Sequence, residues 1–179
     1  MPAATVRQIH SDRVLSASGD PTCVGEGDAM ITDQAGLRLA VRTADCIPVL
    51  LADRRRRIVA AVHAGWRGTL GRIAQGAVDR MRETYGTQAE DIEAAIGPGI
   101  GVCCFEVGAE VAALFGSQAN ERAHLDLPEL NRQQLLDAGL GERSIHIARL
   151  CTRCGQRDFH SFRRDRERAG RMVSSIVIR

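Results

Sequence analysis

The sequence predicts a single mixed α/β domain, built as a sandwich with mixed β-sheets rather than as a barrel. Its 179 residues fit one domain of roughly 100–200 residues. The 44% hydrophobic content is enough to form a core. Short apolar runs of strand type are interspersed with segments of helical period. Because strands and helices do not alternate strictly, the pattern favours an α/β sandwich spanning residues 1–179.

Three apolar runs in the middle of the chain predict neighbouring strands. They cover residues 39–42, 47–52 and 58–62. Asp53 and four consecutive arginines separate the last two runs. We interpret this segment as a solvated hairpin turn rather than as a nucleic-acid patch, because it lies between two apolar strands.

A helix is predicted after His63, because apolar residues recur there at steps of three and four. The apolar positions are Leu70, Ile73, Ala74, Ala77, Val78 and Met81. Thr69 is the expected N-cap, and Gly86 is the expected end of the helix.

The remaining elements follow from shorter patterns. Strands are expected at residues 92–96, 144–150 and 172–178, and a helix at about 107–115. A further helix is expected to begin at Pro128, since proline suits a first helical turn, and to stop near Gly139.

The composition excludes several classes of protein. All 24 basic residues are arginine, which excludes lysine Schiff-base chemistry and a lysine-containing phosphate loop. No apolar run approaches the roughly 18 residues of a membrane span. The first twelve residues lack the apolar core of a signal peptide. We therefore expect a cytoplasmic protein with no membrane partner.

Basic charge is concentrated at the C-terminal end. Residues 151–179 hold eight arginines and three acidic residues, within a total net charge of +2. Such a segment can bind an anion or a nucleic acid. Because no aromatic residue follows Phe162, the aromatic interleaving of single-strand binders is missing. We interpret the segment as an internally paired surface and expect no nucleic-acid partner.

Six cysteines are present, and in a domain with a large core we expect them to be mostly reduced thiols. Cys103 and Cys104 are adjacent and are interpreted as buried thiols. Cys151 and Cys154 form a C-x-x-C motif. This spacing allows metal binding or redox cycling, but without a second pair it favours ordinary thiols.

Soft and borderline metal ligands occur around the predicted hairpin. Cys46 precedes one strand and His63 follows the next, so pairing of the two strands places both residues at one sheet edge. His10 is a third candidate. A His₂Cys set with an open position matches a catalytic Zn2+ site, and Cu2+ is the alternative ion. Two other interpretations remain open: Cys46 as a nucleophile with His63 as its base, and Cys46 as a small core residue.

The glycine-rich turn after His63 predicts an anion site. A strand that turns through Gly65 and Gly68 into a helix exposes backbone N–H groups at the positive end of the helix dipole. Arg67 in this turn can bind phosphate or carboxylate. Arg163 and Arg164 offer a second anion contact, or alternatively a surface ion-pair cluster. The glycines at 97, 99 and 101 lack dinucleotide spacing, so NAD binding is not predicted.

Several motifs together resemble one family in the same order. They are Asp28-Ala-Met-Ile-Thr-Asp33, Arg42-Thr-Ala-Asp-Cys46-Ile-Pro, His63-Ala-Gly-Trp-Arg-Gly68, Ile96-Gly-Pro-Gly-Ile-Gly101, Cys104-Phe-Glu-Val-Gly108, Cys151-Thr and Phe162-Arg-Arg-Asp165. The family is that of the multicopper polyphenol oxidoreductases, or laccase-like proteins, reassigned as purine nucleoside phosphorylases. The resemblance runs from about Gln8 to the C-terminus.

The resemblance implies an α-β-β-α sandwich shared with cysteine hydrolases. It implies zinc held by His10, Cys46 and His63. It also implies phosphorolysis of adenosine, inosine and methylthioadenosine, and deamination of adenosine. The expected partners are thus a small-molecule nucleoside and phosphate. The sequence does not define the oligomeric state, and a monomer is favoured.

Roles for the remaining site residues follow from position beside these motifs. Asp45, next to Cys46, is the candidate for proton transfer to or from the purine base, with Cys46 and His63 completing the catalytic set. Arg42, Arg67, Gly68, Arg163 and Arg164 are the candidate substrate- and phosphate-binding residues.

Two rival functions remain beside a cysteine hydrolase that uses Cys46 and His63. Copper-dependent phenol oxidation ranks lower, because the chain has only five histidines in all and a single His₂Cys site does not readily support four-electron oxygen reduction. A metal-binding remnant or interaction domain is the non-enzymatic rival. It is motivated by the short stretch before His10, where the family's Gly-Gly-Val-Ser and Asn-Arg motifs are expected to be absent. Cys154 is a further departure from the family pattern.

Overall fold

The computed structural model describes residues 3–19, 23–117, 122–155 and 158–179. The strands are β1 (Ala3–Arg7), β2 (Val14–Ser16), β3 (Cys23–Glu26), β4 (Ala29–Thr32), β5 (Arg38–Thr43), β6 (Ile47–Asp53), β7 (Ile58–Ala64), β8 (Ile92–Ile96), β9 (Glu106–Val107), β10 (Ala123–His124), β11 (Ile145–Ile147) and β12 (Met172–Val177). The helices are α1 (Trp66–Leu70), α2 (Ile73–Tyr85), α3 (Ala109–Leu114), α4 (Leu127–Asp137) and α5 (Phe162–Asp165), with short 3₁₀ turns at Ala89–Asp91, Glu142–Ser144 and Arg166–Arg168.

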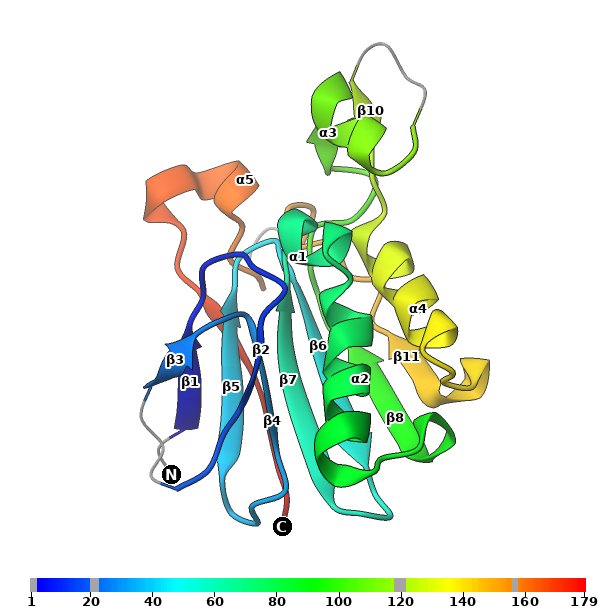
Figure 1. Cartoon of the computed structure of the whole chain (residues 1–179). Helices are drawn as coiled ribbons and strands as arrows, with labels where there is room; N and C mark the ends of the chain where they lie inside the picture. Colours follow the sequence, from blue (N-terminus) through cyan, green and yellow to red (C-terminus); the bar gives the residue numbers. More distant parts are fainter. Residues whose placement is uncertain (1–2, 20–22, 118–121, 156–157) are drawn as a thin grey trace.

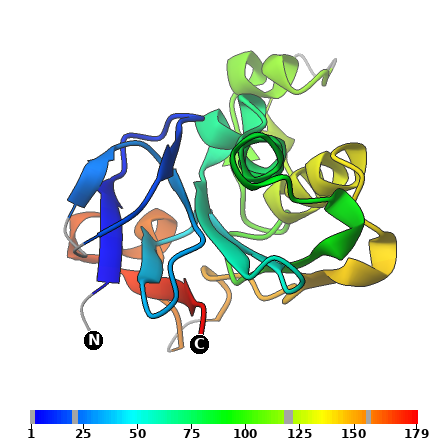
Figure 2. The ribbon, with the colours of Figure 1, turned by 60° about the horizontal axis from the view of Figure 1, so that its bottom comes forward.

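Two mixed sheets pack face to face, as the sequence predicted. The larger has the strand order β11-β8-β6-β7-β4-β2, and the smaller has the order β12-β5-β1-β3. Each sheet contains parallel and antiparallel pairs: β1 is parallel to β5, whereas β12 is antiparallel to it. Helices α2 and α4 lie on the outer face of the larger sheet (Figure 1; Figure 2).

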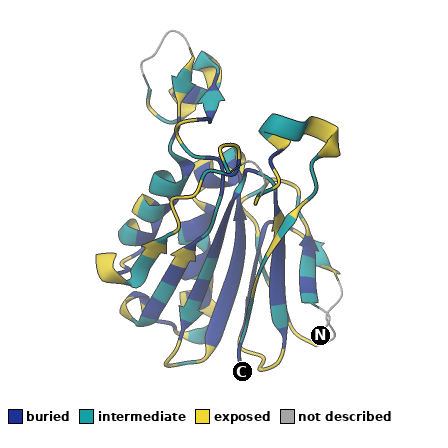
Figure 3. Cartoon of the chain, turned by 180° about the vertical axis from the view of Figure 1, so that it is seen from behind, coloured by how far each residue is buried: buried dark blue, intermediate teal, exposed yellow. Residues whose placement is uncertain are grey.

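Side chains of β4 and β7 alternate between two hydrophobic clusters. One cluster fills the space between the helices and the larger sheet and includes Ile31 and Val62. The other lies between the two sheets and includes Met30 and Ala61. Because successive residues of a strand point to opposite faces, a strand at the centre of the sandwich is buried along its whole length. Every residue of β4 and β7 is accordingly buried, as the dark strands of Figure 3 illustrate.

Among the described residues, α2 and α4 form one helical layer of the expected α-β-β-α arrangement. The short α5 lies at one end of the smaller sheet rather than across its outer face (Figure 1). That outer face carries alternating exposed residues such as Arg42 in β5 and Val173 in β12. The mixed α/β class is confirmed, and its observed layers are helices, larger sheet and smaller sheet.

The predicted central hairpin forms with β6 and β7 paired antiparallel, so that Pro48 lies opposite His63. Its four arginines lie in the turn, as expected for a solvated segment. Arg56 donates to Asp53 and to Asp91, with the second contact at 2.7 Å. Arg57 has a left-handed φ of 58°.

The predicted single helix after His63 is two helices, α1 and α2. The chain breaks between them because Arg72 adopts a left-handed φ of 59°. A side chain at Gly71 would lie 2.8 Å from the Cβ of Asp12, so this close approach requires glycine. Thr69 is not an N-cap: it is buried within α1, and its hydroxyl accepts a hydrogen bond from Asn131 at 3.0 Å. The predicted end at Gly86 is confirmed, with φ 68°.

Other boundaries shift by a few residues. The helix predicted at 107–115 begins at Ala109, because Glu106 and Val107 pair with β10 as a short strand. Helix α4 carries proline in its first turn as expected, and Asp126 caps it by accepting from the Glu129 backbone at 3.0 Å. The strand at 144–150 covers only Ile145–Ile147. No helix in the described ranges has the length and apolar character needed to cross a membrane.

Candidate functional site

His10, Cys46 and His63 come together at the end of the larger sheet where β6 begins and β7 ends. In the hairpin Pro48 pairs with His63 and Ile47 with Ala64, and Cys46 directly precedes the Ile47–Ala64 pair. His10 reaches the same point from the loop between β1 and β2. One ligand atom from each residue lies within 4.8 Å of the other two. The rings of His10 and His63 meet edge to face, with centroids 4.9 Å apart.

Asp28 holds both histidines in place from its position directly before β4. Its side chain is completely buried. One carboxylate oxygen accepts from the His63 Nδ1 at 2.7 Å and from the His10 backbone N–H at 3.0 Å. The other accepts from the Ser11 backbone at 2.6 Å, from its hydroxyl at 2.7 Å and from the Ile9 backbone at 3.2 Å. These contacts stabilise the left-handed φ of 60° at His10.

The electrostatics of the cluster favour charged side chains. Burial alone would raise the pKa of Asp28, but hydrogen bonds from His63 and Ser11 lower it to about 2. Burial opposes protonation of His63, yet Asp28 and Cys46 raise its pKa to about 9. Burial likewise opposes ionisation of Cys46, whose pKa His10 and His63 lower to about 7. Without metal, these opposite shifts favour a thiolate at Cys46 beside an imidazolium at His63.

The donor set fits a transition-metal ion. Two imidazole nitrogens and one thiolate sulfur suit zinc and copper alike. Since Asp28 engages Nδ1 of His63, the opposite ring nitrogen faces Cys46 and is free to ligate. A side chain at Gly65 would lie 3.1 Å from the Cys46 sulfur and from a His10 ring carbon, so glycine here keeps the ligands unobstructed.

His10, Cys46 and His63 line a cavity of about 850 Å³. This size lies within the usual range of roughly 300–1,000 Å³ for small-molecule sites. Phe105 and Phe162 supply aromatic surface to the lining. The remaining lining residues are Val6, Arg7, Gln8, Arg42, Ala44, Asp45, Ile100, Arg163, Ala169, Gly170 and Arg171.

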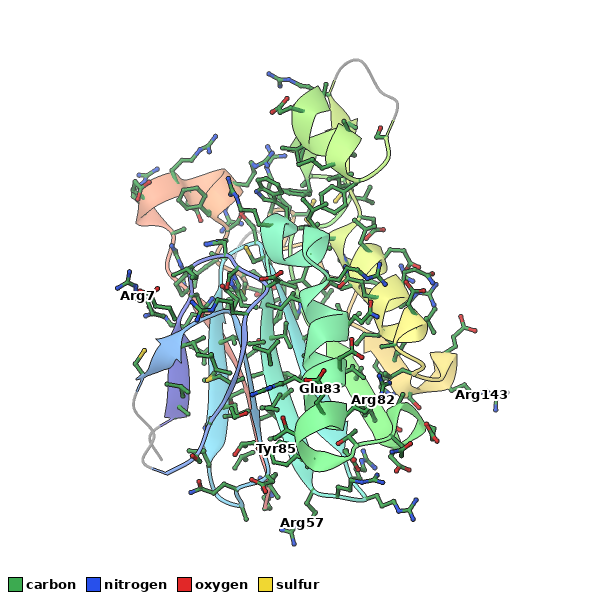
Figure 4. The ribbon with its side chains drawn as sticks, viewed as in Figure 1. Arg7, Arg57, Arg82, Glu83, Tyr85 and Arg143 are labelled. Atoms are coloured by element: carbon green, nitrogen blue, oxygen red, sulfur yellow. The ribbon has the colours of Figure 1, made fainter. Side chains whose placement is uncertain are left out.

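Arginines give the cavity a basic rim. Arg42 is exposed, and no described residue offers its guanidinium a carboxylate; its backbone N–H donates to the Gln8 side chain at 2.8 Å. The guanidinium of Arg163 lies 5.4 Å from the centre of the Phe105 ring and donates to a backbone carbonyl. Arg7, at the edge of the molecule in Figure 4, is paired with Glu26 at 2.9 Å. Arg42 therefore has the most available charge for an anionic ligand.

Asp45 lies between α5 and the cluster of His10, Cys46 and His63. It adopts a left-handed φ of 86°. Its carboxylate accepts from the Thr152 hydroxyl at 2.7 Å and from the Arg163 backbone N–H at 2.6 Å. Its own carbonyl accepts from the Ile100 backbone at 2.7 Å. These contacts join three separate segments of the chain around one cavity-lining carboxylate.

Three of the predicted binding residues lie away from the cavity lining. Arg67 is exposed on α1, with its guanidinium 4.2 Å from the centre of the Trp66 ring. Gly68 is buried, and a side chain there would meet the Ser11 carbonyl at 3.0 Å. The guanidinium of Arg164 donates to Asp165 at 2.8 Å and to the carbonyl of Phe159 at 2.8 Å.

Sequence patterns missed two residues that hold the site together. Asp28 is an acid directly before the apolar residues Ala29, Met30 and Ile31, and a carboxylate buried at such a position needs hydrogen-bond partners. Thr152 gave no such signal, because its partner Asp45 lies 107 positions earlier in the chain.

The expectation that the C-x-x-C motif lacks a second pair is wrong. Cys103 and Cys104 lie beside Cys151 and Cys154, and the four sulfur atoms are all within 4.8 Å of one another. All six cysteines are free thiols, but Cys103 is exposed, so the expectation of a buried thiol holds for Cys104 and is wrong for Cys103. Within the described residues, two groups of side chains can therefore hold a metal ion.

Comparison with known proteins places this chain in a family. The chain is 41% identical to a purine nucleoside phosphorylase of Deinococcus radiodurans over 181 aligned residues, covering 97% of this chain and 69% of that protein. It is 37% identical to adenosine deaminase RL5 from an unknown prokaryotic organism, covering 95% of this chain and 72% of that protein. A purine nucleoside phosphorylase of Bacteroides thetaiotaomicron is 39% identical, and this chain spans 60% of its length.

The fold has a close match among solved structures. The crystal structure of YlmD from Geobacillus stearothermophilus superimposes with a TM-score of 0.93 at 33% identity, covering 98% of this chain and 73% of that one. The family described as "Multi-copper polyphenol oxidoreductase laccase" matches residues 1–179. The chain therefore belongs to this family, whose members similar to it include purine nucleoside phosphorylases and an adenosine deaminase.

Proposed function

We propose that the cavity beside His10, Cys46 and His63 is the site of a metal-dependent purine nucleoside phosphorylase. One observation carries the proposal: a soft-ligand cluster, a fixed carboxylate and an unpaired arginine share the wall of a single cavity. The similarity to purine nucleoside phosphorylases supports the same conclusion. The substrates are then a nucleoside, with adenosine, inosine and methylthioadenosine as candidates, and inorganic phosphate.

Arginine charge supports binding of phosphate. Arg42 is free to offer its guanidinium fork, which matches the oxygens of phosphate. Arg163 lines the same cavity. Because the chain contains no lysine, arginine and backbone N–H groups must supply this function. Arg42 and Arg163 are therefore the proposed phosphate ligands, and Arg67, Gly68 and Arg164 lie outside this set.

The aromatic part of the cavity supports binding of the purine. Phe105 and Phe162 face the same cavity as the two arginines. Stacking on an aromatic ring is a favourable contact for any nucleobase. A nucleoside stacked on either ring would have its ribose in the same cavity as Arg42 and Arg163.

Phosphorolysis then needs the attack of one phosphate oxygen on C1′ of the ribose. The glycosidic C–N bond breaks, and its electron pair goes to the purine nitrogen, which takes up a proton. Asp45 is the proposed group for proton transfer to or from the base. Its hydrogen bonds from Thr152 and Arg163 fix the carboxylate in one orientation.

The ligand set His10, Cys46 and His63 would hold zinc, with copper as the alternative. When bound, zinc supplies a Lewis acid and lowers the pKa of a bound water. The protein's own part is to keep His63 oriented through Asp28 and to keep the cluster open through Gly65.

Adenosine deamination is the second candidate function, favoured by the similarity to adenosine deaminase RL5. A water oxygen would attack C6 of the base, and the amino group would leave as ammonia after taking up a proton. Asp45 is the proposed carrier of this proton as well. Phenol oxidation, which the family description suggests, ranks below both because the chain has only five histidines.

The test incubates the purified protein with adenosine and phosphate and assays adenine, ribose 1-phosphate and inosine. We expect adenine and ribose 1-phosphate in equal amounts. Arg42→Gln should raise the KM for phosphate, whereas Arg67→Gln, an exposed arginine outside the cavity, should leave it unchanged. Absence of all three products from protein that carries zinc at His10, Cys46 and His63 would refute the proposal.

A further inference from the structure

Four cysteines from two distant segments form a second cluster that the proposed reaction does not use. Cys103 and Cys104 follow the glycine-rich loop after β8. Cys151 and Cys154 lie in the turn after β11. An isolated parallel bridge between Gly99 and Cys151 brings the two segments together. The cluster is therefore a product of tertiary structure.

The separations of the sulfur atoms match one tetrahedral ion. Cys103 lies 3.7 Å from Cys104 and 3.7 Å from Cys154, and Cys104 lies 3.3 Å from Cys154. All four sulfurs are within 4.8 Å of one another. A regular tetrahedron with Zn–S bonds of about 2.3 Å has edges of about 3.8 Å. Small movements of the side chains would accommodate a zinc ion at the centre.

Backbone N–H groups around Cys151 favour its thiolate. The Gly101 N–H donates to the Cys151 sulfur at 3.3 Å. The backbone N–H groups of Cys154 and Arg153 also hydrogen-bond to Cys151. Such donors compensate part of the negative charge that four thiolates place on one ion.

A disulfide and an iron–sulfur cluster fit the geometry less well. All six cysteines are free. The sulfur separations of 3.3 and 3.7 Å in the cluster are well above the roughly 2.05 Å of a disulfide bond. An iron–sulfur cluster spreads its cysteine ligands over two or more irons with sulfide between them. The four cysteine sulfurs lie within 4.8 Å of one another, and this spacing has room for a single ion.

We propose that Cys103, Cys104, Cys151 and Cys154 bind one Zn2+ ion, separate from the His10, Cys46 and His63 site. Four protein ligands leave no open position, so this ion is structural rather than catalytic. Each thiol loses its proton to solvent when it ligates.

The ion would fasten two loops that shape the cavity. Phe105, next to Cys104, lines the cavity. Thr152, next to Cys151, donates its hydroxyl to Asp45. The Thr152 backbone also donates to the carbonyl of Gly99 at 2.9 Å. Removing the ion should thus loosen the support of Asp45 without touching His10, Cys46 or His63.

The test measures zinc per chain by mass spectrometry after gel filtration of protein loaded with zinc. We expect two ions in the wild type and one in the double variant Cys103→Ser/Cys154→Ser. Both replaced residues are exposed, so the variant keeps its core. Cys23→Ser, which replaces an exposed cysteine outside both clusters, should retain two ions. His10→Ala should lose only the other ion.

Two further readouts make the result specific. Cobalt substituted for zinc should show the charge-transfer and ligand-field bands of a tetrahedral tetrathiolate, and the double variant should lose these bands. At a free zinc concentration about 1,000 times the Kd of the wild-type site, the Tm of the double variant should be roughly 10 °C below that of the wild type.

The proposal is overturned if the wild type binds no more zinc than the double variant. It is also overturned if the isolated protein has lost two hydrogens to a disulfide within the cluster. Neither result depends on nucleoside turnover, so failure of this proposal is distinguishable from failure of the proposed function.

Discussion

Replacing Asp28 by asparagine tests the role of the most extensively hydrogen-bonded side chain in the site. The aspartate is fully buried and accepts from three backbone N–H groups, the Ser11 hydroxyl and His63. Asparagine has the same shape but only one oxygen. Its NH₂ group therefore replaces one of the two oxygens and faces N–H or O–H donors, either those of His10 and His63 or those of Ser11.

The magnitude follows from those contacts. A buried donor left without a partner costs about 1–3 kcal/mol, and breaking a buried charged pair costs about 3–5 kcal/mol. We expect Asp28→Asn to lower the free energy of unfolding by about 3–5 kcal/mol. If His63 adapts by accepting at Nδ1, its proton moves to the nitrogen that faces Cys46 and blocks ligation. Zinc affinity should therefore fall about 10–100-fold.

Urea denaturation and competitive zinc titration measure the two effects. Asp33→Asn, at an exposed position beyond the end of β4, is the matched control and should change stability by less than about 0.5 kcal/mol. A loss below about 1 kcal/mol in Asp28→Asn, together with unchanged zinc affinity, would refute the reasoning.

The pH dependence gives a second readout of the same carboxylate. Its pKa of about 2 in the folded protein lies below the ordinary value of 3.8. Ionised Asp28 therefore stabilises the fold above about pH 4, and this stabilisation is lost as the pH falls toward 2. The wild type should lose its stability advantage over Asp28→Asn across this interval. An advantage that is constant with pH would contradict the pKa shift.

Three other predictions concern the same cavity. In metal-free protein, the rate of alkylation of Cys46, followed by peptide mapping, should rise with pH with a midpoint near pH 7. His63→Ala should move this midpoint toward pH 9. A midpoint near pH 9 in the wild type would contradict the pairing of Cys46 with His63. Thr152→Val should lower kcat about 10-fold, because Asp45 loses a buried hydrogen bond worth about 1.5 kcal/mol. Thr152→Ser keeps the hydroxyl and should keep the wild-type kcat. Equal kcat values in all three proteins would exclude a role of Thr152 in positioning Asp45. Gly65→Ala places a methyl group 3.1 Å from the Cys46 sulfur and should weaken zinc binding in the titration. Gly141→Ala, at a position with φ −69° (Gly65 has φ −74°) where a Cβ would lie 3.9 Å from its nearest neighbour, should leave zinc binding unchanged.

Local patterns in the sequence determined the central hairpin and the helix beside it. Two apolar runs separated by charged turn residues can bury their surface only by pairing, and this pairing puts Cys46 near His63. The 3.6-residue period of α2 likewise depends only on residues close in the chain. These elements are recognisable because their apolar spacing alone identifies the buried face.

Contacts between distant segments decided the rest. The break at Gly71 depends on Asp12 packing against it, and the position of His10 depends on Asp28 at the start of β4. The four-cysteine cluster exists because a bridge at Gly99 and Cys151 joins residues about 50 positions apart. Periodicity reports which face of an element is buried, but the partner on that face is set by the order of strands in the sheets. Tertiary structure alone therefore placed Asp28, Thr152 and the second cysteine pair.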